Sequence, residues 1–113
     1  MTSYKIIFSI PVHEKYEVIL DQCLNFHFFN PNSGIVLHFS KGFNAQSSQI
    51  DKNTFDKAIE KLDYVFINPY SVRTGWYDII QAHISNFEFI LKNNIDFDYF
   101  SLCASNELFL EKV

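Results

Sequence analysis

The sequence has few glycines and no glycine-rich phosphate loop. Only 3 of its 113 residues are glycine, and neither the G-x-G-x-x-G pattern nor a P-loop occurs. Cysteine is equally scarce: Cys23 and Cys103 give neither a disulfide framework nor a zinc motif, and predict a reducing, cytoplasmic compartment. The net charge of −4 argues against a nucleic-acid-binding surface. No apolar run approaches the roughly 18 residues of a membrane span.

Hydrophobic residues are plentiful and follow a regular pattern. They make up 48 % of the chain, enough for the core of a single domain spanning 1–113. Short apolar runs predict strands over 4–10, 35–39, 64–68 and 97–103. Apolar residues at helical spacing predict helices over 14–29, 54–62 and 76–91. Pro11 is expected to end the first strand, and Asn53 to act as the N-cap of the second helix.

Strands that alternate with helices are typical of a doubly wound α/β fold with a mainly parallel four-stranded sheet. The commonest strand order, 3-2-1-4, places the first and fourth strands side by side, with the winding reversing between them. Ligands bind at that reversal, outside the carboxyl ends of the strands. The pattern therefore points to residues 11–14 and 104–107, and to the turn that contains Arg73.

Three segments of the second half of the chain form a distinctive series: RTGW at 73–76, DIIQAH at 78–83 and DFDYFSLCASNELF at 96–109. They resemble the middle of one enzyme family, the branching N-acetylglucosaminyltransferases (the core-2/I-branching group) and their bacterial relatives. The segment KIIFSIPVH at 5–13 is similar to the family's first strand and its Val-His turn. Together these segments span nearly the whole chain.

The resemblance implies the Rossmann-like half of a metal-independent GT-A-type fold, without a cofactor, in bacterial polysaccharide biosynthesis. The partners that it implies are a nucleotide sugar, in the first place a UDP-sugar, and a glycan acceptor. Arg73 would face phosphate and Glu107 the sugar hydroxyls, while the catalytic base stays unknown. The nucleotide-sugar-binding residues that it implies are Val12, His13, Arg73, Ser105, Asn106 and Glu107.

The chain also departs from the family. The family's Trp-Gly order is reversed here at Gly75 and Trp76, and the family's enzymes are much longer than 113 residues. The resemblance therefore implies the N-terminal part of a longer transferase, inactive by itself. Asp96 and Asp98 have the D-x-D spacing of a metal site but precede the fourth strand, at its opposite end, so no metal is expected there.

Structural interpretations stand beside the functional ones. For His13, contact with a ligand and a role in the turn are equally favoured. For Arg73, contact with phosphate and an ion pair with a carboxylate are equally favoured. His83 is interpreted as a hydrogen-bonded core histidine. The alternative function is a small non-catalytic α/β binding or assembly module. The fourth strand is apolar on both faces, which predicts self-association through its far edge.

Overall fold

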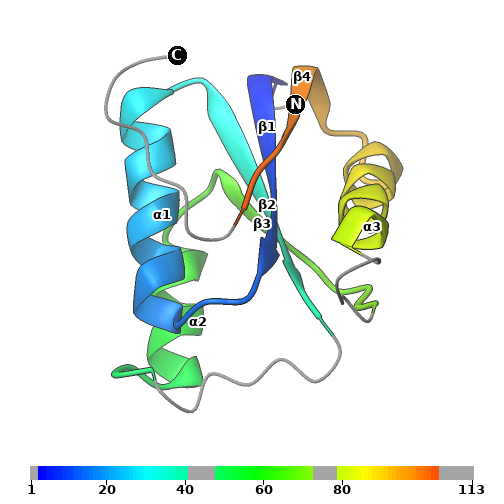
Figure 1. Cartoon of the computed structure of the whole chain (residues 1–113). Coiled ribbons are helices and arrows are strands. Elements are labelled where there is room, and N and C mark those ends of the chain that lie inside the picture. Colours follow the sequence, from blue (N-terminus) through cyan, green and yellow to red (C-terminus); the bar gives the residue numbers. More distant parts are fainter. Residues whose placement is uncertain (1–2, 41–47, 73–78, 105–113) are drawn as a thin grey trace.

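The computed structural model describes residues 3–40, 48–72 and 79–104. In this part of the chain four strands alternate with three helices, as the sequence predicts (Figure 1). The elements are β1 (Ser3–Val12), α1 (Tyr16–Phe29), β2 (Ser33–Phe39), α2 (Lys52–Glu60), β3 (Val65–Asn68), α3 (Ile79–Lys92) and β4 (Asp96–Leu102).

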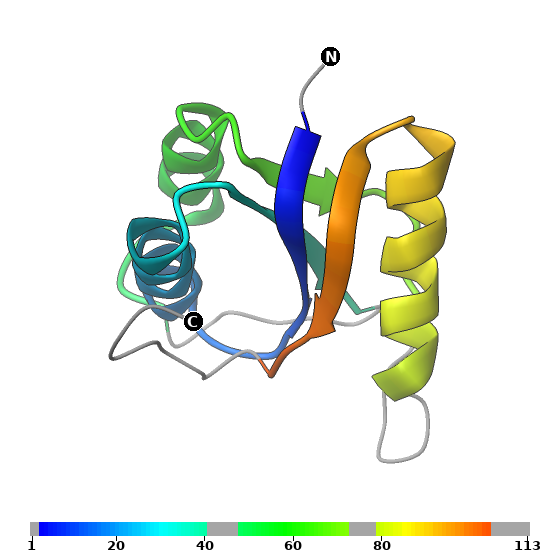
Figure 2. The same cartoon turned by 90° about the horizontal axis from the view of Figure 1, so that it is seen from above.

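The sheet has the order β3-β2-β1-β4 with all strands parallel, which confirms the predicted doubly wound topology. In the register of the sheet, Ile6 of β1 lies opposite Ser33 of β2 and Tyr99 of β4. Helices α1 and α2 cover one face, and α3 covers the other (Figures 1 and 2). Because the strands are parallel, their carboxyl ends meet at one edge, and the winding reverses between β1 and β4.

The core lies between the sheet and its helices and is rich in aromatic rings. The ring of Phe26 in α1 meets that of Phe8 in β1 edge-on, with centroids 4.9 Å apart, and both are almost fully buried. Inside the sheet a Cβ at Gly34 would lie 2.8 Å from Cδ1 of Ile7 and 3.3 Å from the ring of Tyr4. Glycine is therefore the residue that fits this position in β2.

Several elements begin or end one or two residues from the predicted positions, and two residues predicted to mark such a boundary do not do so. Pro11 does not end β1, which continues to Val12. The pairing with β4 stops at Ser9, so Pro11 lies where β1 has a neighbour on one side only, a place where a strand accommodates proline. The N-cap of α2 is Asp51, two residues before the predicted Asn53. The Asp51 carboxylate accepts a hydrogen bond from the N–H of Thr54 at 2.8 Å, and the helix therefore starts before Asn53.

Strand β4 is the least buried of the four strands. Within the described residues it pairs with β1 alone, and Tyr99 and Leu102 are 63 % and 55 % exposed. The apolar pattern of this strand favours a central position, yet here it forms an edge. No helix in the described ranges is long and apolar enough to cross a membrane.

Candidate functional site

A crevice of about 450 Å³ opens at the carboxyl ends of β1 and β4. Its volume falls in the range of roughly 300–1,000 Å³ that is typical of small-molecule sites. The described lining comes from the end of β1, the start of α3 and the end of β4. It comprises Pro11, His13, Glu14, Ile79, His83, Leu102, Cys103 and Ala104. Segments about ninety positions apart in sequence thus meet at the point where α/β folds bind ligands.

The sequence-predicted binding residues have different places relative to this crevice. His13 is exposed and lines it. Val12 is fully buried in the core and does not line the crevice. The remaining predicted binding residues lie outside the described residues: Arg73, Ser105, Asn106 and Glu107. The roles of all six in ligand binding stay predictions.

His83 reaches the crevice from α3 and is held by a buried hydrogen bond. Its Nδ1 lies 2.9 Å from Oγ of Ser9 in β1, and only 8 % of the side chain is exposed. Nδ2 of Asn86, one turn later in α3, donates to the same Oγ at 2.9 Å. The structure thus confirms His83 as a hydrogen-bonded histidine and shows that the same ring lines the crevice.

The hydrogen bonds continue from Asn86 to the end of β3. Nδ2 of Asn68 donates to Oδ1 of Asn86 and to Oγ of Ser85, each at 2.9 Å. Oδ1 of Asn68 accepts from the backbone N–H of Tyr70 at 2.9 Å, and Ser85 donates to the Tyr70 carbonyl at 3.0 Å. This chain of bonds, which we call the Asn68–His83 network, ties α3 to the carboxyl ends of β1 and β3.

His38 of β2 adds another imidazole near this edge. It is fully buried, and its Nε2 accepts from the N–H of Val72 at 3.0 Å. Burial is the largest influence on His38 and lowers its pKa, a backbone hydrogen bond opposes this, and the nearby imidazoles of His13 and His83 disfavour a positive charge on His38. Burial also lowers the pKa of His83. Both buried rings are therefore neutral at neutral pH and act through hydrogen bonds, without a positive charge.

The described residues offer no metal centre. Within 3–40, 48–72 and 79–104, no three or more His, Cys, Asp or Glu side chains gather in a way that would hold a metal ion. Asp96 and Asp98 are exposed at the start of β4, at the opposite edge of the sheet from the crevice, as the sequence analysis expects. Cys23 is buried away from this edge, and its burial raises the pKa of the thiol to about 12.

The two buried histidines predict how stability depends on pH. At pH above the unfolded pKa of about 6.5, both are neutral in the folded and the unfolded chain. Below it the unfolded chain binds protons that folded His38 and His83 resist, so the free energy of unfolding falls as the pH falls. We expect a slope of up to about 1.4 kcal/mol per pH unit for each histidine, measured by urea unfolding between about pH 7.5 and 5.

The matched control is the double variant His38→Gln with His83→Gln. Glutamine retains polar atoms at both positions but does not titrate in this range, so the variant should have a flatter dependence whatever its absolute stability. An unchanged slope in the double variant would show that other groups produce the acid sensitivity.

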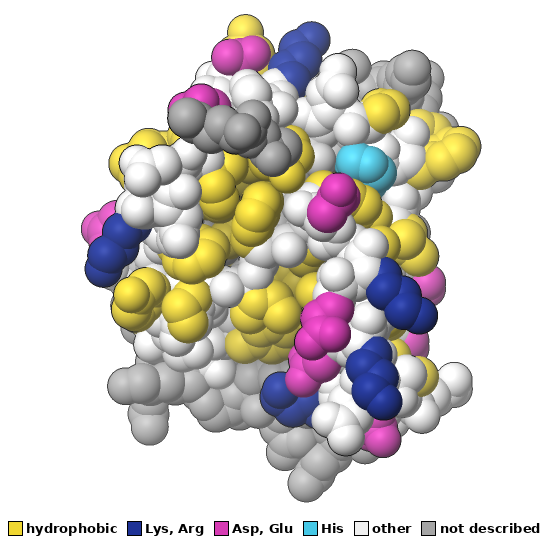
Figure 3. All heavy atoms as spheres, turned by 180° about the vertical axis from the view of Figure 1, so that it is seen from behind, with side chains coloured by type: hydrophobic (Ala, Val, Ile, Leu, Met, Phe, Trp, Pro, Cys, Tyr) yellow, Lys and Arg dark blue, Asp and Glu magenta, His cyan; other side chains and the backbone are white. Residues whose placement is uncertain are grey.

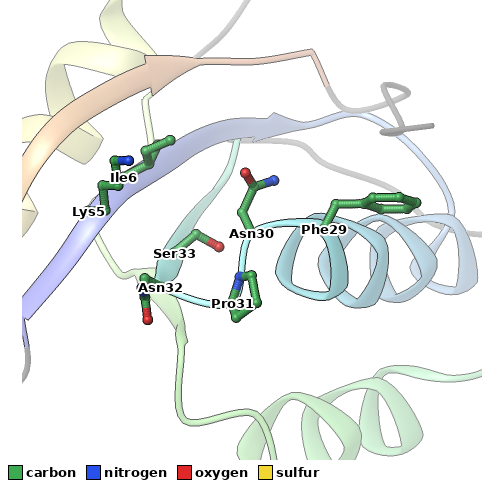
Figure 4. Close-up of a pocket in the computed structure, with 7 residues that line it drawn as sticks. All are labelled: Lys5, Ile6, Phe29, Asn30, Pro31, Asn32 and Ser33. Atoms are coloured by element: carbon green, nitrogen blue, oxygen red, sulfur yellow. The ribbon is translucent and has the colours of Figure 1, made fainter. Parts of the chain in front are cut away.

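A smaller pocket of about 150 Å³ lies at the opposite end of the strands from the crevice, near the amino ends of β1 and β2 (Figure 4). Its lining is Lys5, Ile6, Phe29, Asn30, Pro31, Asn32 and Ser33. None of these residues is predicted to bind a ligand, and the pocket is far from the reversal of the winding. It therefore serves as a comparison site when a ligand is located experimentally.

Most of the polar groups behind the crevice are not among the residues predicted from the sequence. Glu14 falls in the segment that the topology indicates, but Ser9, Asn68 and Asn86 were not singled out. The apolar stripe of this helix misled the prediction, because Ile84 and Leu91 are exposed and the buried face of α3 carries the polar side chains of His83 and Asn86. No local signal marks Ser9, whose partners lie more than 70 positions away.

The chain matches no protein-family model, and the search of curated proteins finds no match either. Its resemblance to the branching N-acetylglucosaminyltransferases therefore rests on the segments quoted above and stays a prediction. The fold class does not depend on it, because the strand order and direction define a doubly wound α/β protein directly.

Proposed function

We propose that this chain is the nucleotide-sugar-binding, N-terminal part of a glycosyltransferase. The enzyme would transfer a sugar from a nucleotide sugar, in the first place a UDP-sugar, to a glycan acceptor. The observation that carries the proposal is the crevice between the ends of β1 and β4. It joins the turn after β1, where the resemblance implies a contact by His13, to the end of β4, which directly precedes the segment 105–107 for which the resemblance implies further contacts.

The proposed roles follow from the charge that each part of the donor requires. A departing diphosphate needs positive charge, and Arg73 would supply it, since the described lining of the crevice contains no Lys or Arg. His13 would lie beside the nucleoside. Glu107, with Ser105 and Asn106, would hydrogen-bond the sugar hydroxyls. No base for the acceptor hydroxyl is assigned, so we expect the chain by itself to bind a donor without turning it over.

Calorimetric titration of UDP in EDTA and in magnesium tests this function. We expect weak binding with the same dissociation constant in both buffers, because Asp96 and Asp98 lie at the far edge of the sheet from the crevice. His13→Ala should weaken binding several-fold, corresponding to about 1 kcal/mol for one lost hydrogen bond.

The matched control is the double variant Asp96→Asn with Asp98→Asn, which should bind UDP as the wild type does. Binding that requires magnesium and disappears in this control variant would contradict the proposal. The same conclusion would follow if no UDP bound at any concentration.

A second candidate function is that of an assembly module, and a surface groove favours it. A groove of about 460 Å³ lies between the outer face of α3 and β4, and its apolar lining includes Ile84, Phe87, Leu91, Phe100 and Leu102. In Figure 3, which views the molecule from behind, α3 lies on the left. Hydrophobic side chains cover that side and the centre of the view, and many charged side chains lie at the lower right. Such a surface is typical of a protein contact.

A further inference from the structure

The Asn68–His83 network has a defined direction, because it begins at a backbone group. The N–H of Tyr70 can only donate, so the atom of Asn68 that it contacts must be the carbonyl oxygen, Oδ1. The amide nitrogen of Asn68 must then donate to Asn86, which fixes the Asn86 oxygen on that side. The remaining amide nitrogen of Asn86 therefore faces Ser9 as a donor.

This direction determines the protonation of His83. Oγ of Ser9 accepts from Asn86, so its single hydrogen is left for Nδ1 of His83, 2.9 Å away. A hydrogen on Nδ1 would leave the buried Ser9 hydroxyl without an acceptor among the groups that contact it, which is costly. Nδ1 therefore accepts, and the neutral ring carries its hydrogen on Nε2.

The Nε2 atom of His83 is available to a ligand. Within the part of the chain that the structure describes, no group bonds to it. The ring lines the crevice together with Glu14, and it also borders the groove between α3 and β4. Because burial lowers the pKa of His83, the ring offers an N–H donor without a positive charge.

The other groups of the described lining suit a sugar better than they suit a phosphate. Glu14 supplies the one carboxylate, which accepts hydrogen bonds from hydroxyl groups but repels an anion. Ile79, Leu102 and Cys103 supply an apolar surface for the C–H groups of a ring. The donor of His83, the carboxylate of Glu14 and the apolar wall match a polyhydroxylated, uncharged ring, and the exposed imidazole of His13 adds a further polar group to the described lining.

We propose that this crevice is a pyranose subsite in which His83 donates from Nε2–H to a sugar oxygen and Glu14 accepts from a sugar hydroxyl. The inference rests on the proposed function only in taking the sugar to be that of a nucleotide sugar. It adds two residues, His83 and Glu14, to those that the resemblance implies. It also gives the Asn68–His83 network a positioning role, since the network fixes which nitrogen of His83 faces the ligand.

The tautomer is tested first, without any ligand, by nitrogen-15 NMR of the histidine rings. In the wild-type chain we expect His83 to have a protonated Nε2 and an unprotonated Nδ1. Ser9→Ala removes the donor to Nδ1 and should leave a mixture of the two tautomers in a folded chain. A wild-type His83 with the hydrogen on Nδ1 would overturn the inference.

Binding is tested by calorimetry with UDP-N-acetylglucosamine, UDP and free N-acetylglucosamine. His83→Leu should weaken both sugar-containing ligands by roughly three- to tenfold and leave the affinity for UDP unchanged, because one hydrogen bond to the sugar is lost. His83→Gln, which keeps a side-chain N–H donor, should lose less than His83→Leu. Glu14→Gln should weaken the two sugar ligands and not UDP.

The outcomes separate this inference from the proposed function. Binding of UDP and UDP-N-acetylglucosamine that His83→Leu and Glu14→Gln leave unchanged would overturn the sugar subsite while supporting nucleotide binding. Binding of free N-acetylglucosamine that depends on His83, with no affinity for UDP, would support the subsite and contradict the nucleotide-sugar function. Binding of none of the three ligands would contradict both.

Discussion

Replacing Asn86 by leucine should lower the free energy of unfolding by about 2–4 kcal/mol. Asn86 is fully buried, and its side chain bonds both to Asn68 Nδ2 and to Ser9 Oγ. Leucine has a similar size but no polar atoms, so the substitution leaves two buried groups each short of one partner. An unsatisfied buried polar group costs about 1–3 kcal/mol, which is larger than the net value of most hydrogen bonds.

Urea unfolding measures this loss, and Ser85→Ala is the matched control. Ser85 lies next to Asn86 in α3 and bonds to the same Asn68, but it is only partly buried, so water replaces the lost contact. We expect this control to cost less than about 1 kcal/mol. Equal losses of the free energy of unfolding in the two variants would show that the buried hydrogen bonds of Asn86 stabilise the fold no more than those of the partly buried Ser85.

The second large effect is expected in solution, where the chain should self-associate through the groove between α3 and β4. Leu102 of β4 is more than half exposed and lines this groove with the exposed Ile84 and Leu91 of α3. Tyr99, on the same strand, is also more than half exposed. Pairing of two β4 edges would satisfy backbone groups and bury these side chains. An antiparallel pair centred on Tyr99 would also keep the Asp98 carboxylates of the two copies apart.

Light scattering across a concentration series should give an average mass that rises from 13.3 kDa toward twice that value. Ile84→Glu should raise the dissociation constant at least about tenfold, equivalent to about 1.4 kcal/mol, because it buries an unpaired charge in the interface. Leu24→Glu is the control, since Leu24 is as exposed but lies on α1, on the other face of the sheet. A chain that stays monomeric throughout the series would contradict the prediction.

The order of the elements could be predicted from the sequence because each strand and helix carries its own hydrophobic period. The runs around Ile7, Val36 and Ile67 have strand length, and apolar residues at helical spacing mark the helix predicted over 76–91. Most of that apolar stripe does not enter the core, because Ile80, Ile84 and Leu91 are exposed while Asn86 and Ile90 are buried. The commonest winding then gives the observed strand order. The N-cap of α2 could not be chosen in the same way, because Asp51 and Asn53 carry equally suitable side-chain oxygens and only the chain path decides between them.

The candidate site was predictable in position but not in composition. Parallel strands must end at one edge, so the segment that contains His13 and the end of β4 had to meet there. The hydrogen bonds that orient His83 depend on contacts between residues far apart in sequence, and no local pattern encodes them.

One measurement tests the central claim most directly: amide NMR of the 113-residue chain during titration with UDP-N-acetylglucosamine in EDTA. The account predicts saturable shifts at the carboxyl edge, at His13, Glu14, His83 and Cys103, with Lys5 and Asn32 of the smaller pocket unaffected (Figure 4). Shifts confined to Lys5 and Asn32, or no saturable shift at His13 and His83, would contradict the claim that this crevice binds a nucleotide sugar.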